Sequence, residues 1–422
     1  MPTGRSPRSP RRASLAGAIA LAVVVTALLA ACTGQPSASG GNQSGGAATT
    51  GGNNAGGNNA GGTTTSGDPV SINITPAADS SVSPSTPIVV SASHGALRTV
   101  TVTNAATHVV VTGAFSADKS TWTSNEPLGF GASYQVVASG AGMTGTPAQQ
   151  TATVNTISPS VTAYPSLLPA PNTSDVGVGQ PIVVLFDHAV AQANRADVEK
   201  ALRVTSNPPQ TGGWNWVSAK EVHYRPENYW TPGTTINVNV NVYGVDFGNG
   251  VFGQTDRNET LHVHDSWIAQ ANGATEQMQI FHNGQLVKTM PISLGSPGHP
   301  SHVGVHVISD KQPSIVMDSC TYGVCKGQPG YYSETVYLDE RISDDGEFVH
   351  SAPWSVGSQG SDNVSHGCVN LSPANAQWFF NTFGPGDVVN ITNSGGPQLP
   401  LWDIYGDWEL SWQQYQAGSA LS

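Results

Sequence analysis

The chain has 422 residues, of which only 10% are charged, and its formal net charge at pH 7 is −12. At roughly 100–200 residues per domain, this length predicts two to four domains and excludes a single small module. Because 28 acidic residues outnumber 16 basic ones, no basic surface is expected, which excludes nucleic acid as the partner. The 48 glycines and 29 prolines favour turn-rich β structure.

The N-terminus has the order of a secretory signal, because four arginines and no acidic residue precede the apolar run 15–31. Its ending, Leu29-Ala30-Ala31-Cys32, resembles the lipobox of bacterial lipoproteins, in which the cysteine becomes the lipidated N-terminus. We therefore expect a signal peptide over 1–31 and an exported lipoprotein that is held in the cell membrane through Cys32 and faces the cell wall or periplasm. An uncleaved anchor with an incidental Cys32 is the alternative.

The segment 33–67 is dominated by Gly, Asn, Thr, Ser and Ala and contains no charged residue. Such a composition cannot bury a core, so we expect residues 32–67 to form a disordered tether that begins at the lipidated cysteine.

Two β modules are predicted next, over 68–157 and 158–264, and they resemble copies of one another. The string Pro87-Ile88-Val89-Val90 recurs 94 positions later, and Trp122 and Tyr134 correspond to Tyr224 and Ile236 at a spacing of 102. Short β-rich runs between turn residues favour two immunoglobulin-like sandwiches, with one short helix near 194–202. Neither contains a catalytic constellation, so both are interpreted as spacers.

The chemistry lies in the last third, in the string Ser365-His366-Gly367-Cys368-Val369-Asn370, with His350 eighteen positions before the cysteine. A cysteine nucleophile needs a base within hydrogen-bond reach, and the base needs a third group to orient its ring. His350 can supply the imidazole. The turn through Gly367 can present the thiol and expose backbone amides as an oxyanion hole.

This string is similar to the signature of the L,D-transpeptidase (YkuD-like) family: a His, a spacer, then Ser/Thr-His-Gly-Cys and, after one residue, Asn or Arg. The resemblance begins near residue 265 and includes an opening hairpin (266–280), a turn (282–284) and a substrate-wall strand (291–295). With two preceding immunoglobulin-like modules, the chain looks most like mycobacterial and actinobacterial L,D-transpeptidase lipoproteins. The resemblance implies a β-rich catalytic domain over 265–396; the residues themselves predict its one main helix near 372–383 and a closing strand at 387–392.

Family resemblance also implies the activity: a cysteine acyl-enzyme that forms 3→3 cross-links between diaminopimelate residues of peptidoglycan stem peptides and releases the terminal D-alanine of the donor tetrapeptide. Donor and acceptor stems would be its partners, carbapenems its inhibitors, and no cofactor or metal is expected. Carried onto this chain, Cys368 is the nucleophile, His350 is the base, and the Ser351 carbonyl orients the imidazole. Gly367 and Cys368 amides would hold the oxyanion with help from His366. Residues implied to line the substrate pocket are Met317, Tyr332, Trp354, Ser365 and Asn370.

Two alternatives within the family, an L,D-carboxypeptidase and an enzyme that attaches proteins to stem peptides, would form the same acyl-enzyme. A non-catalytic wall-associated lipoprotein is a third alternative. A sortase needs an arginine after the cysteine, whereas no Lys or Arg follows Arg341. Papain-like peptidases place the cysteine before the histidine, whereas here His350 comes first, so the residue order counts against that class. His299, His302 and His306 suggest a metal site, but surface histidines are the commoner case.

Cys320 and Cys325 lie around Gly323, in the stretch that the resemblance makes the lid over the site. In an oxidising compartment we expect them to form a disulfide; two free thiols are the alternative.

The tail, 397–422, contains Trp402, Trp408, Trp412 and Tyr415. So many aromatic residues predict that it packs on the folded part; a carbohydrate-binding platform is the alternative.

Overall fold

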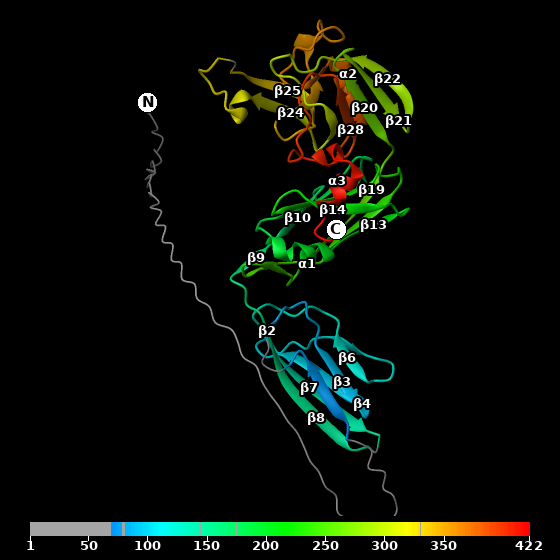
Figure 1. Ribbon diagram of the computed structural model, residues 1–422, viewed down its shortest axis with the longest axis vertical. Coiled ribbons are helices and arrows are strands. Elements are labelled where there is room, and N and C mark those ends of the chain that lie inside the picture. Colours follow the sequence, from blue (N-terminus) through cyan, green and yellow to red (C-terminus); the bar gives the residue numbers. More distant parts are fainter. Residues whose placement is uncertain (1–68, 78–80, 144, 172, 174, 330) are drawn as a thin grey trace, which may run out of the picture. The chain divides into compact units, whose positions relative to one another are not determined.

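The computed structural model describes residues 69–77, 81–143, 145–171, 173, 175–329 and 331–422. The predicted signal peptide, Cys32 and the tether over 32–67 lie outside these residues. Across the described ranges, we find no helix with the length and apolar character needed to span a membrane. Strands dominate the chain (Figure 1), which confirms the mainly β fold class.

The first module is a sandwich of two four-stranded sheets. One sheet has the order β1-β3-β6-β5, and the other has the order β2-β8-β7-β4 with β2 parallel to β8. Their bounds are β1 (Ser71–Thr75), β2 (Ser81–Val82), β3 (Val89–Ser93), β4 (Gly95–Asn104), β5 (Gly113–Phe115), β6 (Thr121–Ser124), β7 (Ser133–Gly142) and β8 (Pro147–Thr156). Along β7, Tyr134, Val136 and Ala138 are buried and alternate with more exposed residues, as expected for a strand with one face on the core.

The second module repeats this arrangement, with sheets β10-β12-β15-β14 and β11-β19-β16-β13 and a parallel β11–β19 pair. A three-stranded sheet, β17-β18-β9, and the short helix α1 (Arg195–Lys200) are added. The strands are β9 (Val161–Ala163), β10 (Pro165–Leu168), β11 (Asp175–Val176), β12 (Ile182–Phe186), β13 (Leu202–Asn207), β14 (Gly212–Trp216), β15 (Glu221–Pro226), β16 (Thr235–Val240), β17 (Asp246–Gly248), β18 (Val251–Gly253) and β19 (Arg257–Val263). The shared strand order supports the repeat that the sequence predicts.

One of the predicted equivalences is wrong by two residues. Trp122 lies opposite Val90, and at the corresponding place in the second module Val222 lies opposite Val184. Trp122 therefore corresponds to Val222 and not to Tyr224. A shift of two residues leaves a strand residue on the same face, so the hydrophobic pattern alone does not reveal it.

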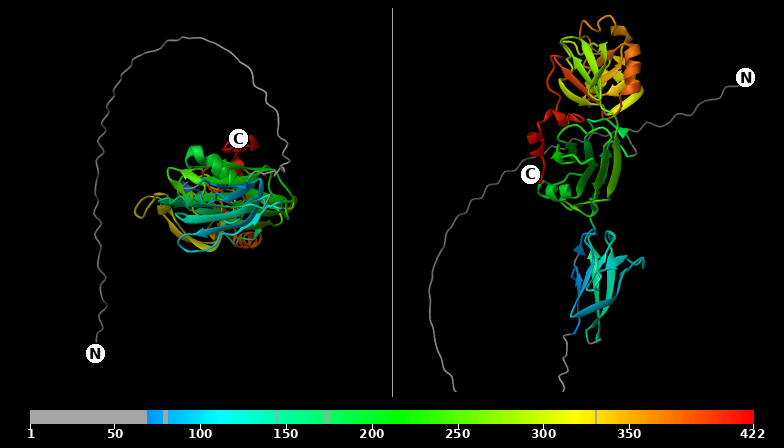
Figure 2. Two further views of the ribbon diagram at one scale, coloured as in Figure 1. Left: turned by 90° about the horizontal axis from the view of Figure 1, so that it is seen from below. Right: turned by 90° about the vertical axis from the view of Figure 1, so that its right-hand side faces the viewer.

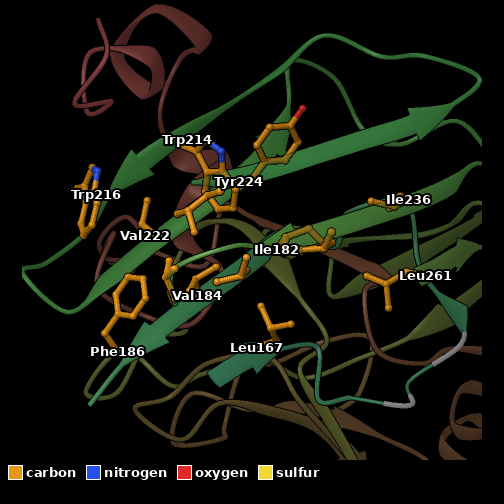
Figure 3. Packing of buried hydrophobic residues seen from close by; sticks show 14 of the residues in the cluster. Leu167, Ile182, Val184, Phe186, Trp214, Trp216, Val222, Tyr224, Ile236 and Leu261 are labelled. Atoms are coloured by element: carbon orange, nitrogen blue, oxygen red, sulfur yellow. The ribbon is translucent and has the colours of Figure 1, made fainter. Parts of the chain in front are cut away.

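Aromatic rings fill much of the second module's core, which contains no cysteine. Figure 3 shows Trp214, Trp216, Tyr224 and Phe186 among the aliphatic side chains of the facing strands. The rings of Trp214 and Tyr224 meet edge to face with centroids 5.2 Å apart, and those of Phe186 and Trp216 are 6.4 Å apart. Such large buried side chains supply the apolar area on which this module's stability rests.

The tail packs on the second module, as predicted, and contains the capped helix α3 (Trp412–Gln416). The guanidinium of Arg225, on β15, lies 4.5 Å from the ring centroid of Trp408, 5.4 Å from that of Trp412 and 4.4 Å from that of Tyr415. The side chain of Asn215 donates to the carbonyl of Tyr415 at 3.1 Å. Three of the tail's four predicted rings therefore contact a buried arginine of the preceding module.

A buried ion-pair cluster fixes the same contact and predicts a pH-dependent stability. His223 Nδ1 lies 2.9 Å from Asp407 Oδ1, and its Nε2 lies 2.8 Å from Glu221 Oε1. Burial alone would lower the pKa of His223, but the two carboxylates outweigh it and raise the pKa from 6.5 to about 9. Because the folded-state pKa is the higher one, the stabilisation is complete below pH 6.5 and is lost as the pH rises through about 9.

We expect the melting temperature to fall between about pH 7 and pH 10, with on the order of 3 kcal/mol lost. Thermal unfolding of wild type and His223→Gln across this range checks it: the variant should be less stable at pH 7 and should lack this slope. Equal slopes in the two proteins would contradict the assignment to His223.

The catalytic domain is β-rich with one main helix, as predicted, and its strands form two sheets. One sheet has the order β22-β21-β20-β28-β23, and the other has the order β24-β25-β26-β27. The strands are β20 (Trp267–Asn272), β21 (Gln277–His282), β22 (Gln285–Pro291), β23 (Gly304–Val307), β24 (Asp310–Asp318), β25 (Ser333–Arg341), β26 (Phe348–Ser351), β27 (Val369–Leu371) and β28 (Val388–Thr392). Asn283 and Gly284 both have positive φ in the predicted turn between β21 and β22, as a tight hairpin turn requires.

Helix α2 (Pro373–Thr382) lies beside these strands (Figure 2, orange). The Ser372 hydroxyl accepts from the amide of Asn375, and Pro373 occupies the first turn, where its missing N–H costs nothing. Phe379 is buried and stacks on Phe383, with ring centroids 4.0 Å apart. Helix α2 thereby packs against β26 and β27, the two strands that contain or adjoin His350 and Cys368.

Candidate active site

Parallel pairing of β26 and β27 brings the predicted histidine and cysteine together. His350 lies opposite Asn370 in this pair, and Cys368 directly precedes β27. The predicted wall strand lies on the other side of β27, where Ser293 exchanges backbone hydrogen bonds with Asn370 at 2.9 and 3.2 Å. Three segments that are distant in sequence therefore converge at one strand end.

The turn before the nucleophile is held in place by its own serine. The Ser365 hydroxyl donates to the carbonyl of Cys368 at 2.7 Å and accepts from the amide of Gly367 at 3.1 Å. Gly367 has a φ of 129°, a conformation that side chains rarely adopt, and a Cβ there would lie 3.3 Å from Glu347 Oε1. Ser365 therefore shapes the turn as well as lining the pocket.

His350 is 3% exposed and has a fixed orientation. Its Nδ1 lies 3.0 Å from the carbonyl oxygen of Ser351, to which it donates, as the resemblance implied. Nε2 is then left as the proton-accepting nitrogen. Burial lowers the pKa of His350 to about 4, although the Ser351 carbonyl and the Asn370 side chain oppose this shift.

The thiol of Cys368 is also buried, and burial raises its pKa to about 12. The nearby carboxylates of Glu347 and Asp345 act in the same direction. Its Sγ lies 3.7 Å from the carbonyl of Gly346, and this described site has no hydrogen bond between Cys368 and His350. These two pKa shifts favour a neutral thiol and a neutral imidazole in the resting site at neutral pH.

Two cavities meet at the thiol. The smaller, about 290 Å³, is lined by His350 and by all the predicted pocket residues: Met317, Tyr332, Trp354, Ser365 and Asn370. The larger, about 570 Å³, excludes His350 and is rich in carboxylates. Cys368 and His366 line both cavities. A substrate on either side can therefore reach the same sulfur atom.

The segment between Met317 and Tyr332 borders both cavities and contains a disulfide between Cys320 and Cys325. Gly323, between the two cysteines, has a φ of 97°, which allows the tight turn. The sole free cysteine among the described residues is Cys368.

Glu347, which the sequence analysis did not assign, lies against His302 and His306, two of the histidines that it weighed as metal ligands. Glu347 Oε1 lies 3.2 Å from His302 Nδ1, and its Oε2 lies 3.2 Å from His306 Nε2. In the part of the chain that the structure describes, no group of His, Cys, Asp and Glu is arranged to hold a metal ion. The one signal for Glu347 in the sequence is its position three residues before His350; its closeness to the Gly367 turn is visible only in the structure.

The low pKa of His350 predicts the pH dependence of acylation. The base must be unprotonated to accept the thiol proton, so the acylation rate should be constant from about pH 5 to 8 and should fall only near pH 4. Stopped-flow acylation by a carbapenem over this range measures it. A decline centred near pH 6.5 would show that His350 titrates like an exposed histidine and would contradict the effect of burial.

A buried cysteine that follows a glycine turn, beside a histidine whose ring is oriented by a backbone carbonyl, is the arrangement of a cysteine acyltransferase site. Residues 266–391 match the family model of the L,D-transpeptidase catalytic domain, and residues 79–246, which include parts of both modules, match that of a bacterial Ig domain.

Curated relatives specify the family further. The chain is 40% identical over 334 residues to L,D-transpeptidase 2 of Mycobacterium tuberculosis, with 79% of this chain and 81% of that protein covered. It is 32% identical to L,D-transpeptidase 5 of the same species, with 82% and 75% covered. A solved L,D-transpeptidase in complex with imipenem shares 36% identity and a TM-score of 0.47, covering 54% of this chain and 97% of that one. The chain belongs to the L,D-transpeptidase family.

Proposed function

We propose that the protein forms 3→3 cross-links in peptidoglycan through a thioester on Cys368. The observation that carries this proposal is the junction of two cavities at one buried thiol, with His350 lining only one of them. The donor tetrapeptide would bind on the His350 side. An acceptor stem could then reach the thioester from the opposite side.

In the first step, His350 Nε2 takes the thiol proton as Sγ attacks the carbonyl of the donor's diaminopimelate residue. The amide of Cys368, with His366, stabilises the negative oxygen of the tetrahedral intermediate. The Gly367 amide, which the resemblance also implied for this role, donates to the Ser365 hydroxyl in the resting site. His350 then passes the proton to the departing D-alanine amine. Because both groups are neutral at rest, deprotonation of the thiol accompanies the attack.

Incubating purified protein with a disaccharide tetrapeptide and sequencing the products by tandem mass spectrometry tests the proposal. We expect a dimer that is linked between two diaminopimelate residues and whose mass is that of two substrate molecules minus one D-alanine. Release of D-alanine with only a free tripeptide product would instead indicate an L,D-carboxypeptidase.

We also propose that carbapenems acylate Cys368. A related L,D-transpeptidase has been solved with imipenem, and the smaller cavity beside Cys368 offers an apolar wall of Met317, Trp354 and Val336. Attack on the β-lactam carbonyl would use the same base and the same oxyanion amide as attack on the stem peptide.

Membrane attachment is a further part of the proposal, because Leu29-Ala30-Ala31-Cys32 resembles a lipobox. Cys32→Ala is expected to remove the protein from the lipid-modified membrane fraction, since the thioether-linked lipid has no other acceptor at this position. Metabolic labelling with a fatty acid, followed by fractionation, measures this. An unlabelled wild-type protein that still sediments with membranes would support the uncleaved anchor instead.

A further inference from the structure

The larger cavity has a distinct chemical character. Four carboxylates line it, and the single lysine or arginine among its described lining residues is Arg341. The carboxylates belong to Asp318, Asp344, Asp345 and Glu347. Such a lining favours a positively charged group next to the Cys368 thiol.

His302 lines this cavity with a carboxylate behind it. Its Nδ1 lies 3.2 Å from Glu347 Oε1 and 3.6 Å from Asp345 Oδ2, and its side chain is 16% exposed. Glu347 is buried, accepts the His302 backbone amide at 2.9 Å and also faces His306. The backbone amide of His302 fixes the carboxylate, which lies within ion-pair distance of the His302 imidazole at the cavity wall. A carboxylate beside a histidine is the arrangement of a general base.

The second step of the reaction needs such a base, because the acceptor amine must lose protons when it attacks the thioester. The acceptor arrives as an ammonium with three N–H bonds, because an alkyl amine has a pKa near 10. The amide product keeps one N–H, so two protons must leave as the C–N bond forms and the C–S bond breaks. One proton returns to Sγ through His350 and restores the thiol. The other needs a second acceptor.

We propose that His302, held by Glu347, is this second base and takes a proton from the acceptor amine in the larger cavity. This inference rests on the proposed function and extends it, because it assigns the carboxylate-lined cavity to a cationic acceptor and separates the base of each half-reaction. The proton then passes from His302 to solvent through the open cavity.

Charges around the imidazole fit this role. The Glu347 carboxylate raises the pKa of His302 against the effect of its burial, and Asp345 and Asp403 act in the same direction. For Glu347, burial would raise the pKa, but the imidazoles of His302 and His306 outweigh it and keep the carboxylate ionised. A base whose pKa lies above that of a free histidine is better matched to an amine.

Two rates separate this inference from the proposed function: the acylation of Cys368 by a carbapenem or donor, and the transfer of the acyl group to an amine acceptor. His302→Gln should acylate within about twofold of wild type but transfer at least about tenfold more slowly, with more of the thioester lost to water. His282→Gln is the matched control, because His282 also lies against a carboxylate, 3.0 Å from Asp265 Oδ2, but lines neither cavity, so both of its rates should stay within about twofold of wild type.

Glu347→Gln supplies a second readout, because Gln keeps the size of the side chain and can still accept the His302 amide. It should lower the pKa of His302 and so move the acidic limb of the transfer rate to lower pH, while the acylation profile stays in place. Unchanged transfer in His302→Gln, or equal losses in both rates, would overturn the inference. Absence of any adduct on wild-type Cys368 would overturn the proposed function itself.

Discussion

Replacing Cys368 with alanine is expected to abolish both cross-linked dimer formation and covalent capture of a carbapenem. Cys368 is the sole free cysteine among the described residues and the one side chain of the predicted nucleophile type that lines both cavities. Without a sulfur no thioester can form, and the oxyanion amide alone has nothing to stabilise. Product analysis and intact-protein mass spectrometry measure the two losses.

The lid disulfide offers a matched control. A double variant with serine at Cys320 and Cys325 removes two sulfur atoms from the lid but leaves the nucleophile in place, so it should still gain one adduct per chain. A carbapenem adduct on Cys368→Ala, at whatever residue, would remove Cys368 from its proposed role.

Replacing His350 with alanine should slow acylation by about 10²–10⁴-fold while the protein remains folded. The buried thiol has a pKa of about 12, so it cannot ionise at neutral pH without a base beside it. Near pH 10 the variant should recover part of the lost rate, because hydroxide then generates thiolate directly. Acylation kinetics at both pH values, with a melting curve at each, separate lost chemistry from lost structure.

Trp354→Phe is the control for this change, since Trp354 lies near the imidazole, with ring centroids 6.0 Å apart, but carries no proton in the mechanism. It should alter the apparent substrate affinity more than the limiting rate. Unchanged acylation in His350→Ala would move the base to another residue.

Residue order predicts the catalytic pair because β26 and β27 are adjacent and parallel. The 18 positions between His350 and Cys368 are enough for the chain to cross from β26 to the parallel strand β27. The carbonyl that orients the imidazole belongs to Ser351, the next residue along β26. Local patterns of this kind also predict helix α2, whose serine cap and proline are readable from the chain. These features depend on residues that are close in sequence.

Other features depend on contacts between distant segments. Glu347 meets His302 across 45 positions, and Arg225 meets Leu410 across 185, so no periodicity in the chain indicates either contact. Burial is equally non-local, and it lowers the pKa of His350 and raises that of Cys368. The sequence therefore predicts that His350 and Cys368 share one site, but it does not indicate how burial shifts their pKa values.

During the reaction a thioester on Cys368 is expected to carry the donor peptide. Rapid quenching of the wild-type protein with a tetrapeptide donor, without acceptor, followed by peptide mapping, detects this thioester. The peptide containing Cys368 should gain the mass of the donor minus its terminal D-alanine, through a bond that hydroxylamine cleaves. Release of D-alanine with no adduct, or with the adduct on another residue, would contradict it.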